Sequence, residues 1–268
     1  MNDLAHPGIL MPPPRDGLGP AHTVERIVAM RRPAPDLVRF ETTRPPQFRF
    51  TPGHYARLGL GPGEAIVWRP YSIASPAGCE RLAFHFTRVP AGAFNALFEK
   101  LAPDDPIRID RRSFGFLTLA QVAPGGVLWL VATGTGIAPF VSMLADGATW
   151  ARHDGVVVVH SVRHAAELAT AEIEAAIASR GEAHGRVRVV PVVTRERAEG
   201  ALDARIGTLL RAGTLESTAG QALDATRSRL MVCGNPDMVA DVRALARERG
   251  FEPGRRGLPG KIATEGYW

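Results

Sequence analysis

The pattern of apolar residues changes near residues 118–125, and this change limits what the chain can fold into. Before it, residues 21–117 hold short apolar segments such as LVRFETT at 37–43, separated by Pro- and Gly-rich turns. Short strands punctuated in this way predict an antiparallel β-barrel or sandwich. One segment, FNALFEKLA at 94–102, has the three- and four-residue apolar spacing of a helix.

From about residue 126, strand patterns alternate with helix patterns. The expected strands contain near-continuous Val and Leu runs, as in VLWLVATG, VVVVHSVR, VRVVPVVTR and LMVCGNP. Helical patterns follow the first, second and fourth of these, at 138–150, 167–180 and 237–250. Strands that are apolar on both faces and alternate with helices predict an α/β doubly wound parallel sheet.

We therefore expect two domains and a short arm. Residues 21–122 are expected to form the antiparallel β-barrel, and residues 123–268 the α/β domain. Residues 1–20, with three consecutive prolines and two glycines near their end, are expected to be a flexible arm.

Composition argues against several classes of protein. The net charge is +5, but we find neither a helix-turn-helix signature nor a basic stripe interleaved with aromatics, so no nucleic-acid partner is expected. No apolar run approaches the ~20 residues that span a bilayer, so no membrane association is expected. The two cysteines, Cys79 and Cys233, form no metal-binding pattern. We expect no metal site and a cytoplasmic location.

A glycine turn, ATGTGIAPF at 132–140, follows the first strand of the α/β half and opens a helix. Bare backbone amides beside a helix N-terminus form an anion site, so Gly134 and Gly136 are candidates for phosphate contact. The G-x-G-x-x-G spacing of the dinucleotide fingerprint is broken at Pro139–Phe140. A tight turn without a ligand stays open as the alternative.

Arginines follow the expected strand ends. Arg163 and Arg195 each come directly after a strand, and Arg205 stands a few residues further along. In open α/β sheets, ligands bind outside the carboxyl ends of the strands. Converging guanidinium groups suit a dianionic phosphate, although each arginine taken alone could be an ordinary surface residue.

The segment RPYSIAS at 69–75 interrupts a strand pattern with a cation, a phenol and hydroxyls. An edge strand with a solvated face is one explanation. The other is that a flat, negatively charged molecule lies across the strand.

These motifs together resemble one known family. RPYSIASP, VPAGAFNALFEKL, ATGTGIAPF, CGNPDM and the terminal ATEGYW occur in family order, and the chain is similar over residues 22–268 to the bacterial ferredoxin (flavodoxin)–NADP reductases. The resemblance implies an FAD-binding barrel followed by an NADP-binding domain. It also implies hydride exchange between NADP(H) and flavin N5, and electron exchange with an acidic ferredoxin or flavodoxin. A monomer is expected. A related NAD(P)H-dependent flavin or quinone reductase, an oxygenase-feeding reductase and a non-catalytic nucleotide sensor stay open.

The resemblance also implies roles for single residues at the flavin. Arg69 is expected at the FAD pyrophosphate, Tyr71 against the isoalloxazine, and Ser72 near N5. Tyr267 is expected over the other flavin face and Trp268 near the adenine. Asn95 stands where the family usually has Thr or Ser, and His85 where relatives often have an aromatic. The full expected FAD set is Arg69, Pro70, Tyr71, Ser72, His85, Ala93, Phe94, Asn95, Thr135, Tyr267 and Trp268.

For the nicotinamide nucleotide, the resemblance implies that three arginines hold the 2′-phosphate and that Cys233 faces the nicotinamide. Glu265 is expected to handle a proton or to place the nicotinamide, unless it is a solvated tail carboxylate. Ser72, Tyr71, Cys233 and Glu265 form the expected catalytic group. The expected NADP set is Gly134, Gly136, Val162, Arg163, Thr194, Arg195, Arg205, Gly234, Asn235, Pro236 and Asp241.

Overall fold

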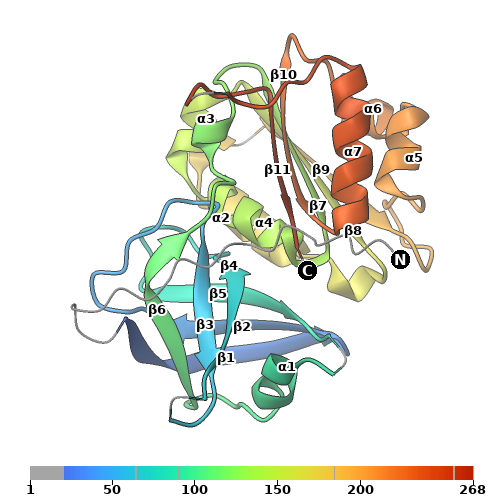
Figure 1. The fold of residues 1–268 in the computed structure, drawn as a ribbon. Helices are drawn as coiled ribbons and strands as arrows, with labels where there is room; N and C mark the ends of the chain where they lie inside the picture. Colours follow the sequence, from blue (N-terminus) through green and yellow to red (C-terminus); the bar gives the residue numbers. More distant parts are fainter. Residues whose placement is uncertain (1–20, 64, 90, 184, 256, 268) are drawn as a thin grey trace, which may run out of the picture.

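The computed structural model describes residues 21–63, 65–89, 91–183, 185–255 and 257–267, and Figure 1 shows the described chain as a barrel beside a layered α/β unit. The expected arm at 1–20 lies outside the described residues. Within the barrel, six antiparallel strands follow one another in the spatial order β4-β3-β6-β1-β2-β5. They are β1 (His22–Ala34), β2 (Leu37–Thr43), β3 (Tyr55–Leu60), β4 (Val67–Ser72), β5 (Arg81–Thr87) and β6 (Pro106–Phe114).

The two edge strands of this sheet meet, which makes it a barrel. Ile73, directly after β4, forms an antiparallel bridge with Phe84 of β5. The amide of Ala74 donates to the carbonyl of Ala83 at 2.8 Å. Closure in this way leaves fewer unpaired backbone groups at the sheet edges. The barrel expected from short strands and turns is confirmed.

Aromatic side chains fill the barrel. Helix α1 (Ala93–Phe98) inserts Phe94 and Phe98 into the core, where the Phe98 ring stacks on Phe86 with centroids 4.2 Å apart. The helix is shorter than the expected 94–102. Pro103 disfavours helical backbone at the residue before it, so the helical pattern cannot continue to its expected end.

In the α/β unit, five strands form a parallel sheet in the order β11-β10-β7-β8-β9, which confirms the expected fold class. The strands are β7 (Val127–Thr133), β8 (Gly155–Val162), β9 (Val187–Val193), β10 (Ser228–Gly234) and β11 (Ile262–Gly266). The helices are α2 (Ala138–Leu144), α3 (Gly147–Arg152), α4 (Thr170–Ala178), α5 (Ile206–Arg211), α6 (Thr214–Ala219) and α7 (Pro236–Glu248). Short 3₁₀ turns are η1 (Leu119–Gln121), η2 (Gly134–Ile137), η3 (Ala165–Glu167) and η4 (Gly181–Ala183).

Helices cover both faces of the parallel sheet. Leu128 and Leu130 of β7 point into a cluster formed with α2, α3 and α4, whereas Trp129 and Val131 point into a second cluster with α5, α6 and α7. The barrel faces α2 and α4 (Figure 1). Ser142 of α2 donates its hydroxyl to the carbonyl of Ser75 in the barrel at 2.7 Å. Because helices cover both faces of the parallel sheet, successive strand residues are buried on alternate faces, which explains the unbroken Val and Leu runs.

Three features of the α/β unit differ from the sequence-based expectation. The expected single helix at 138–150 is two helices, because the Asp146 side chain caps a new helix by accepting from the amide of Ala148 at 3.0 Å. Helices α5 and α6 were not expected. Residues 262–266, taken as part of a tail, form β11 and pair in parallel with β10. The domain boundary at 122/123 stays a prediction.

No helix within the described ranges is both long enough and apolar enough to cross a membrane.

The stacked rings predict how the barrel responds to truncation. Phe98→Ala should lower the free energy of unfolding by about 3–5 kcal/mol, because it leaves a cavity where Phe98 is fully buried. Urea unfolding followed by tryptophan fluorescence measures this loss. The same substitution at Phe116, which is 83% exposed, should change the free energy by less than about 0.5 kcal/mol. Equal losses in the two variants would contradict the assigned core.

Candidate functional site

The order in which the chain adds strands to the parallel sheet reverses beside β7. The chain runs from β7 through β8 to β9, then crosses back to β10 and β11 on the other side of β7. Ligands of doubly wound sheets bind at such a switch point, at the carboxyl ends of the strands. Most of the expected NADP residues lie at or after these ends of β7, β8, β9 and β10, whereas Asp241 lies within α7 (Pro236–Glu248).

The two glycines of the turn after β7 serve different purposes. Gly134 has a φ of +53°, and a side chain there would meet nothing within 4 Å, so the turn is open above it. A Cβ at Gly136 would lie 2.5 Å from the carbonyl oxygen of Cys233, so only glycine fits against β10. One glycine therefore brings the turn against its neighbour strand, and the other leaves room for a ligand beside exposed backbone.

A second turn, after β10, is joined to the first. Thr133 accepts the amide of Asn235 through its hydroxyl at 2.8 Å, and Gly234 approaches Thr133 too closely for any side chain. The Asn235 side chain caps α7 by accepting from the amides of Asp237 and Met238. Pro236 is the first residue of that helix. Thr133 carried no sequence signal beyond its position before the glycine turn.

Backbone contacts bring two of the arginine segments together. The amide of Arg195 donates to the carbonyl of Arg163 at 2.9 Å, and Thr194 donates both its amide and its hydroxyl to the carbonyl of Val162. The segment that leads to Arg205 returns beside β9 through a bridge between Val192 and Leu202.

The side chains of Arg163, Arg195 and Arg205 are all exposed. Among the described residues, none of the three forms an ion pair with a carboxylate. Exposed guanidinium groups without acidic partners at one sheet edge are suited to bind a phosphate.

Residues expected at the flavin meet residues of the α/β unit. The hydroxyls of Ser72, at the end of β4, and Tyr267, after β11, form a hydrogen bond across the two domains. The amide of Tyr267 donates to the carbonyl of Gly234 at 2.8 Å. Cys233 of β10 pairs in register with Glu265 of β11. Four residues expected from the resemblance therefore gather at the domain junction.

The junction shifts the ionisation of its acidic groups. Burial raises the pKa of Glu265 to about 7, partly opposed by a hydrogen bond with Tyr267. Burial also raises the pKa of Cys233 well above its usual range, so this thiol stays neutral near pH 7. Glu265 is therefore a carboxyl that can hold or release a proton near neutral pH.

The residues expected along the FAD path lie on the barrel in different surroundings. Tyr71 packs against the rings of Phe86 and Phe94, whereas Arg69 is exposed and donates to the carbonyl of Trp68, at 2.8 Å. Phe94 itself is buried in the core. The Asn95 side chain donates to the carbonyl of Val89 at 2.6 Å and so braces its own loop.

Further expected residues have other neighbours. Thr135 lies 3.4 Å, hydroxyl to hydroxyl, from Thr87 of the barrel. Asp241 forms an ion pair with Arg211. His85 is buried at the domain junction, where burial lowers its pKa to about 3. Trp268 lies outside the described residues. The ligand roles of these residues, and of Pro70 and Ala93, stay predictions.

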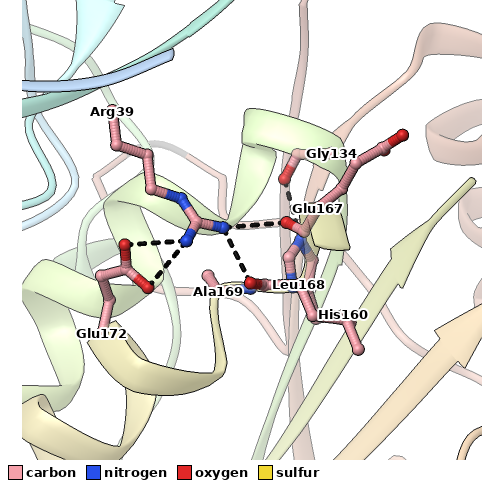
Figure 2. A network of polar contacts seen from close by, with 7 residues as sticks. All are labelled: Arg39, Gly134, His160, Glu167, Leu168, Ala169 and Glu172. Atoms are coloured by element: carbon pink, nitrogen blue, oxygen red, sulfur yellow. Dashed lines mark hydrogen bonds and ion pairs between the residues drawn. The ribbon is translucent and has the colours of Figure 1, made fainter. Parts of the chain in front are cut away.

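Sequence reasoning missed two polar residues that hold the loop after β8. Arg39 of β2 reaches this loop from the barrel, and His160 of β8 reaches it from within the α/β unit (Figure 2). An isolated arginine in a strand pattern gave no signal of such a contact.

Comparison with known proteins agrees with this geometry. Residues 130–244 match the family model of the oxidoreductase NAD-binding domain. Ferredoxin–NADP reductase A of Sorangium cellulosum is 37% identical over 252 residues, which cover 92% of this chain and 90% of that protein. The flavodoxin/ferredoxin–NADP reductase of Escherichia coli is 36% identical over 228 residues, covering 85% and 91%.

A solved structure shares the architecture. The ferredoxin NADP⁺ reductase of Neisseria gonorrhoeae, with bound FAD and NADP, superposes with a TM-score of 0.85 at 33% identity, covering 92% of this chain and 99% of that one. Because the match covers 92% of this chain, it spans both the barrel and the α/β unit. By its sequence and its fold, the chain belongs to the ferredoxin (flavodoxin)–NADP reductases.

Proposed function

We propose that this oxidoreductase holds FAD on the barrel at the domain junction and NADP(H) at the carboxyl ends of the parallel strands. The observation that carries the proposal is the contact of Ser72 with Tyr267, beside Cys233 and Glu265. It joins the barrel segment RPYS to the strand ends of the NADP crevice. The gonorrhoeal relative, which has bound FAD and NADP, supports this arrangement.

The residues present fit an FAD. The exposed guanidinium of Arg69 can pair with a pyrophosphate, and the Tyr71 ring is held by aromatic neighbours in a fixed orientation. Ser72 offers a hydroxyl at the junction. When bound, the flavin supplies the chemistry that accepts a hydride and releases electrons singly. The protein supplies orientation, because Tyr71 and Ser72 belong to strand β4 and Tyr267 directly follows strand β11.

At the nucleotide crevice, charge selects the ligand. Arg163, Arg195 and Arg205 bind the 2′-phosphate that NADPH carries and NADH lacks. The glycine turn offers backbone amides next to open space at Gly134. Cys233 and Glu265 lie at the strand end where the nicotinamide is placed, and Glu265 exchanges a proton there.

The electron carrier is an acidic ferredoxin or flavodoxin, as the names of the relatives suggest. A net charge of +5 favours steering of such a carrier toward the protein. We further propose that the protein acts as a cytoplasmic monomer.

Direct reduction tests the proposed function. The purified protein should hold about one FAD per chain, and NADPH should bleach the flavin absorbance in a stopped-flow instrument. Turnover should then be highest with a member of a panel of ferredoxins and flavodoxins. A protein that cannot be loaded with FAD, or whose bound flavin is not reduced by NADPH, would refute the proposal.

The arginines predict a preference for NADPH. Arg195→Ala or Arg205→Ala should cost on the order of 1.5–3 kcal/mol of NADPH binding, because each removes a charge-assisted hydrogen bond to the phosphate. The KM for NADPH rises accordingly, and the KM for NADH stays nearly unchanged. Arg247→Ala, in the last turn of α7, is the control and should change neither. Equal effects on both nucleotides would assign the two arginines another role.

The raised pKa of Glu265 predicts a dependence of stability on pH. In the unfolded chain this carboxyl ionises near its ordinary pKa of 4.5, whereas in the folded protein it stays protonated up to about pH 7. The folded protein therefore loses stability relative to Glu265→Gln as the pH rises from about 4.5 to about 7, and the difference is constant above that. Urea midpoints of both proteins across this range measure the effect. A constant difference between pH 4 and 8 would mean that the carboxyl titrates normally.

A further inference from the structure

A single arginine of the barrel holds a loop of the other domain. Arg39, in β2, directs its guanidinium across the junction, as Figure 2 shows. One terminal nitrogen contacts both carboxylate oxygens of Glu172 in α4, at 2.9 and 3.1 Å. The other donates to the backbone carbonyls of Glu167 and Leu168, at 2.9 and 2.8 Å. The planar fork thus satisfies a carboxylate and two carbonyls at once.

The two carbonyls belong to the loop that carries Arg163. This loop runs from the end of β8 to the start of α4, and the amide of Arg163 lies 3.4 Å from the Glu167 carboxylate. On its other side, the amide of Ala165 donates to Glu196, next to Arg195, at 2.7 Å. The loop is therefore fixed both by the barrel and by the segment after β9.

His160 connects the same loop to the glycine turn. The amide of Ala169 donates to Nδ1 of His160 at 3.3 Å, so the proton of the neutral ring lies on Nε2. That nitrogen lies 3.0 Å from the carbonyl oxygen of Gly134 and donates to it. Both ring nitrogens are used, and burial lowers the pKa of His160 to about 4, so the ring stays neutral at working pH. The histidine holds loop and turn at a set separation.

Arg39 is largely buried, so its positive charge needs partners close by. Its side chain is 13% exposed and that of Glu172 19% exposed. Buried His85 and His160 lie near the guanidinium and do not offset its charge. A buried guanidinium that loses its partners strongly destabilises the fold. Arg39 is therefore expected to keep its contacts with Glu172 and the two carbonyls.

We propose that Arg39 is a positioning residue for nucleotide selection: it holds the Arg163 loop, through the carbonyls of Glu167 and Leu168, where Arg163 meets the 2′-phosphate. The inference rests on the proposed binding of NADP(H) at this crevice. It assigns part of the NADPH preference to a residue of the barrel domain, which does not itself touch the nucleotide. Loss of Arg39 removes the loop's anchor on the barrel and so weakens a contact that NADH does not make.

Arg249 offers a matched control. It too contacts a carboxylate, Glu216, at 3.0 Å and a backbone carbonyl, Leu210, at 2.9 Å, but it joins α7 to α5 and α6 within one domain. Arg249→Met should lower stability in the same manner as Arg39→Met and leave nucleotide binding unchanged.

The experiment is isothermal titration of the FAD-loaded protein with NADP⁺, together with steady-state KM values for NADPH and NADH. Arg39→Met should weaken NADP⁺ binding by about 3- to 30-fold, the range of substitutions that act through an intervening network. The KM for NADPH should rise with it, whereas the KM for NADH and kcat should change little. Unchanged NADP⁺ affinity, or an equal rise for both nucleotides, overturns the inference.

A double-mutant cycle of Arg39 and Arg163 distinguishes a positioning role of Arg39 from a general loss of protein stability. If Arg39 acts through Arg163, then Arg39→Met should have little further effect on NADP⁺ affinity in an Arg163→Ala background. Full additivity of the two changes overturns the inference. Should Arg39→Met fail to fold, Glu172→Gln removes only the ionic partner and must still weaken NADP⁺ binding; an unchanged affinity in that variant overturns it as well. A wild-type protein that does not bind NADP⁺ would instead refute the proposed function.

Discussion

The parallel pairing of β7 with β10 is the constraint on which the site depends. These strands are neighbours in space but far apart in the chain, and their ends carry the glycine turn and the segment CGNP. The turns fit together because Gly136 lies against the carbonyl of Cys233 and Thr133 accepts the amide of Asn235. Any side chain at Gly136 would separate the strands and open the switch point. The close approach of the two turns therefore depends on glycine at position 136.

The proposed site has an exposed part at the carboxyl edge of the sheet and a buried part at the domain junction. At the edge, Arg163 and Arg195 are exposed, as suits groups that exchange water for a charged phosphate. At the junction, Glu265 and Cys233 are shielded, and burial keeps both protonated to higher pH than in water. The groups proposed to recognise charge and the group proposed to exchange a proton therefore lie in different dielectric surroundings. The Arg39 network joins the barrel to the loop that carries Arg163 at the exposed edge.

Much of the fold could be read from local patterns. The strands of both halves were predicted because apolar alternation and buried Val runs are local signals, and the parallel order followed from helices between the strands. Helix lengths are harder to predict: Asp146 caps a new helix inside the expected one, because its short side chain accepts from the nearby backbone amide of Ala148. Strand β11 escaped prediction because IATEG has no apolar run and gains its partners only from β10.

The family, the two domain types and the residues proposed to bind phosphate could all be predicted from sequence, because each depends on short motifs whose chemistry is local. Which of these residues meet is a property of the packed fold. Ser72 and Tyr267 are 195 positions apart, and Arg39 and Glu172 are 133 apart. Contacts over such separations depend on how two separately packed units dock, and no periodicity within either unit encodes that geometry. The structure likewise placed Glu265 where burial raises its pKa, since a carboxyl's environment is set by its neighbours in space.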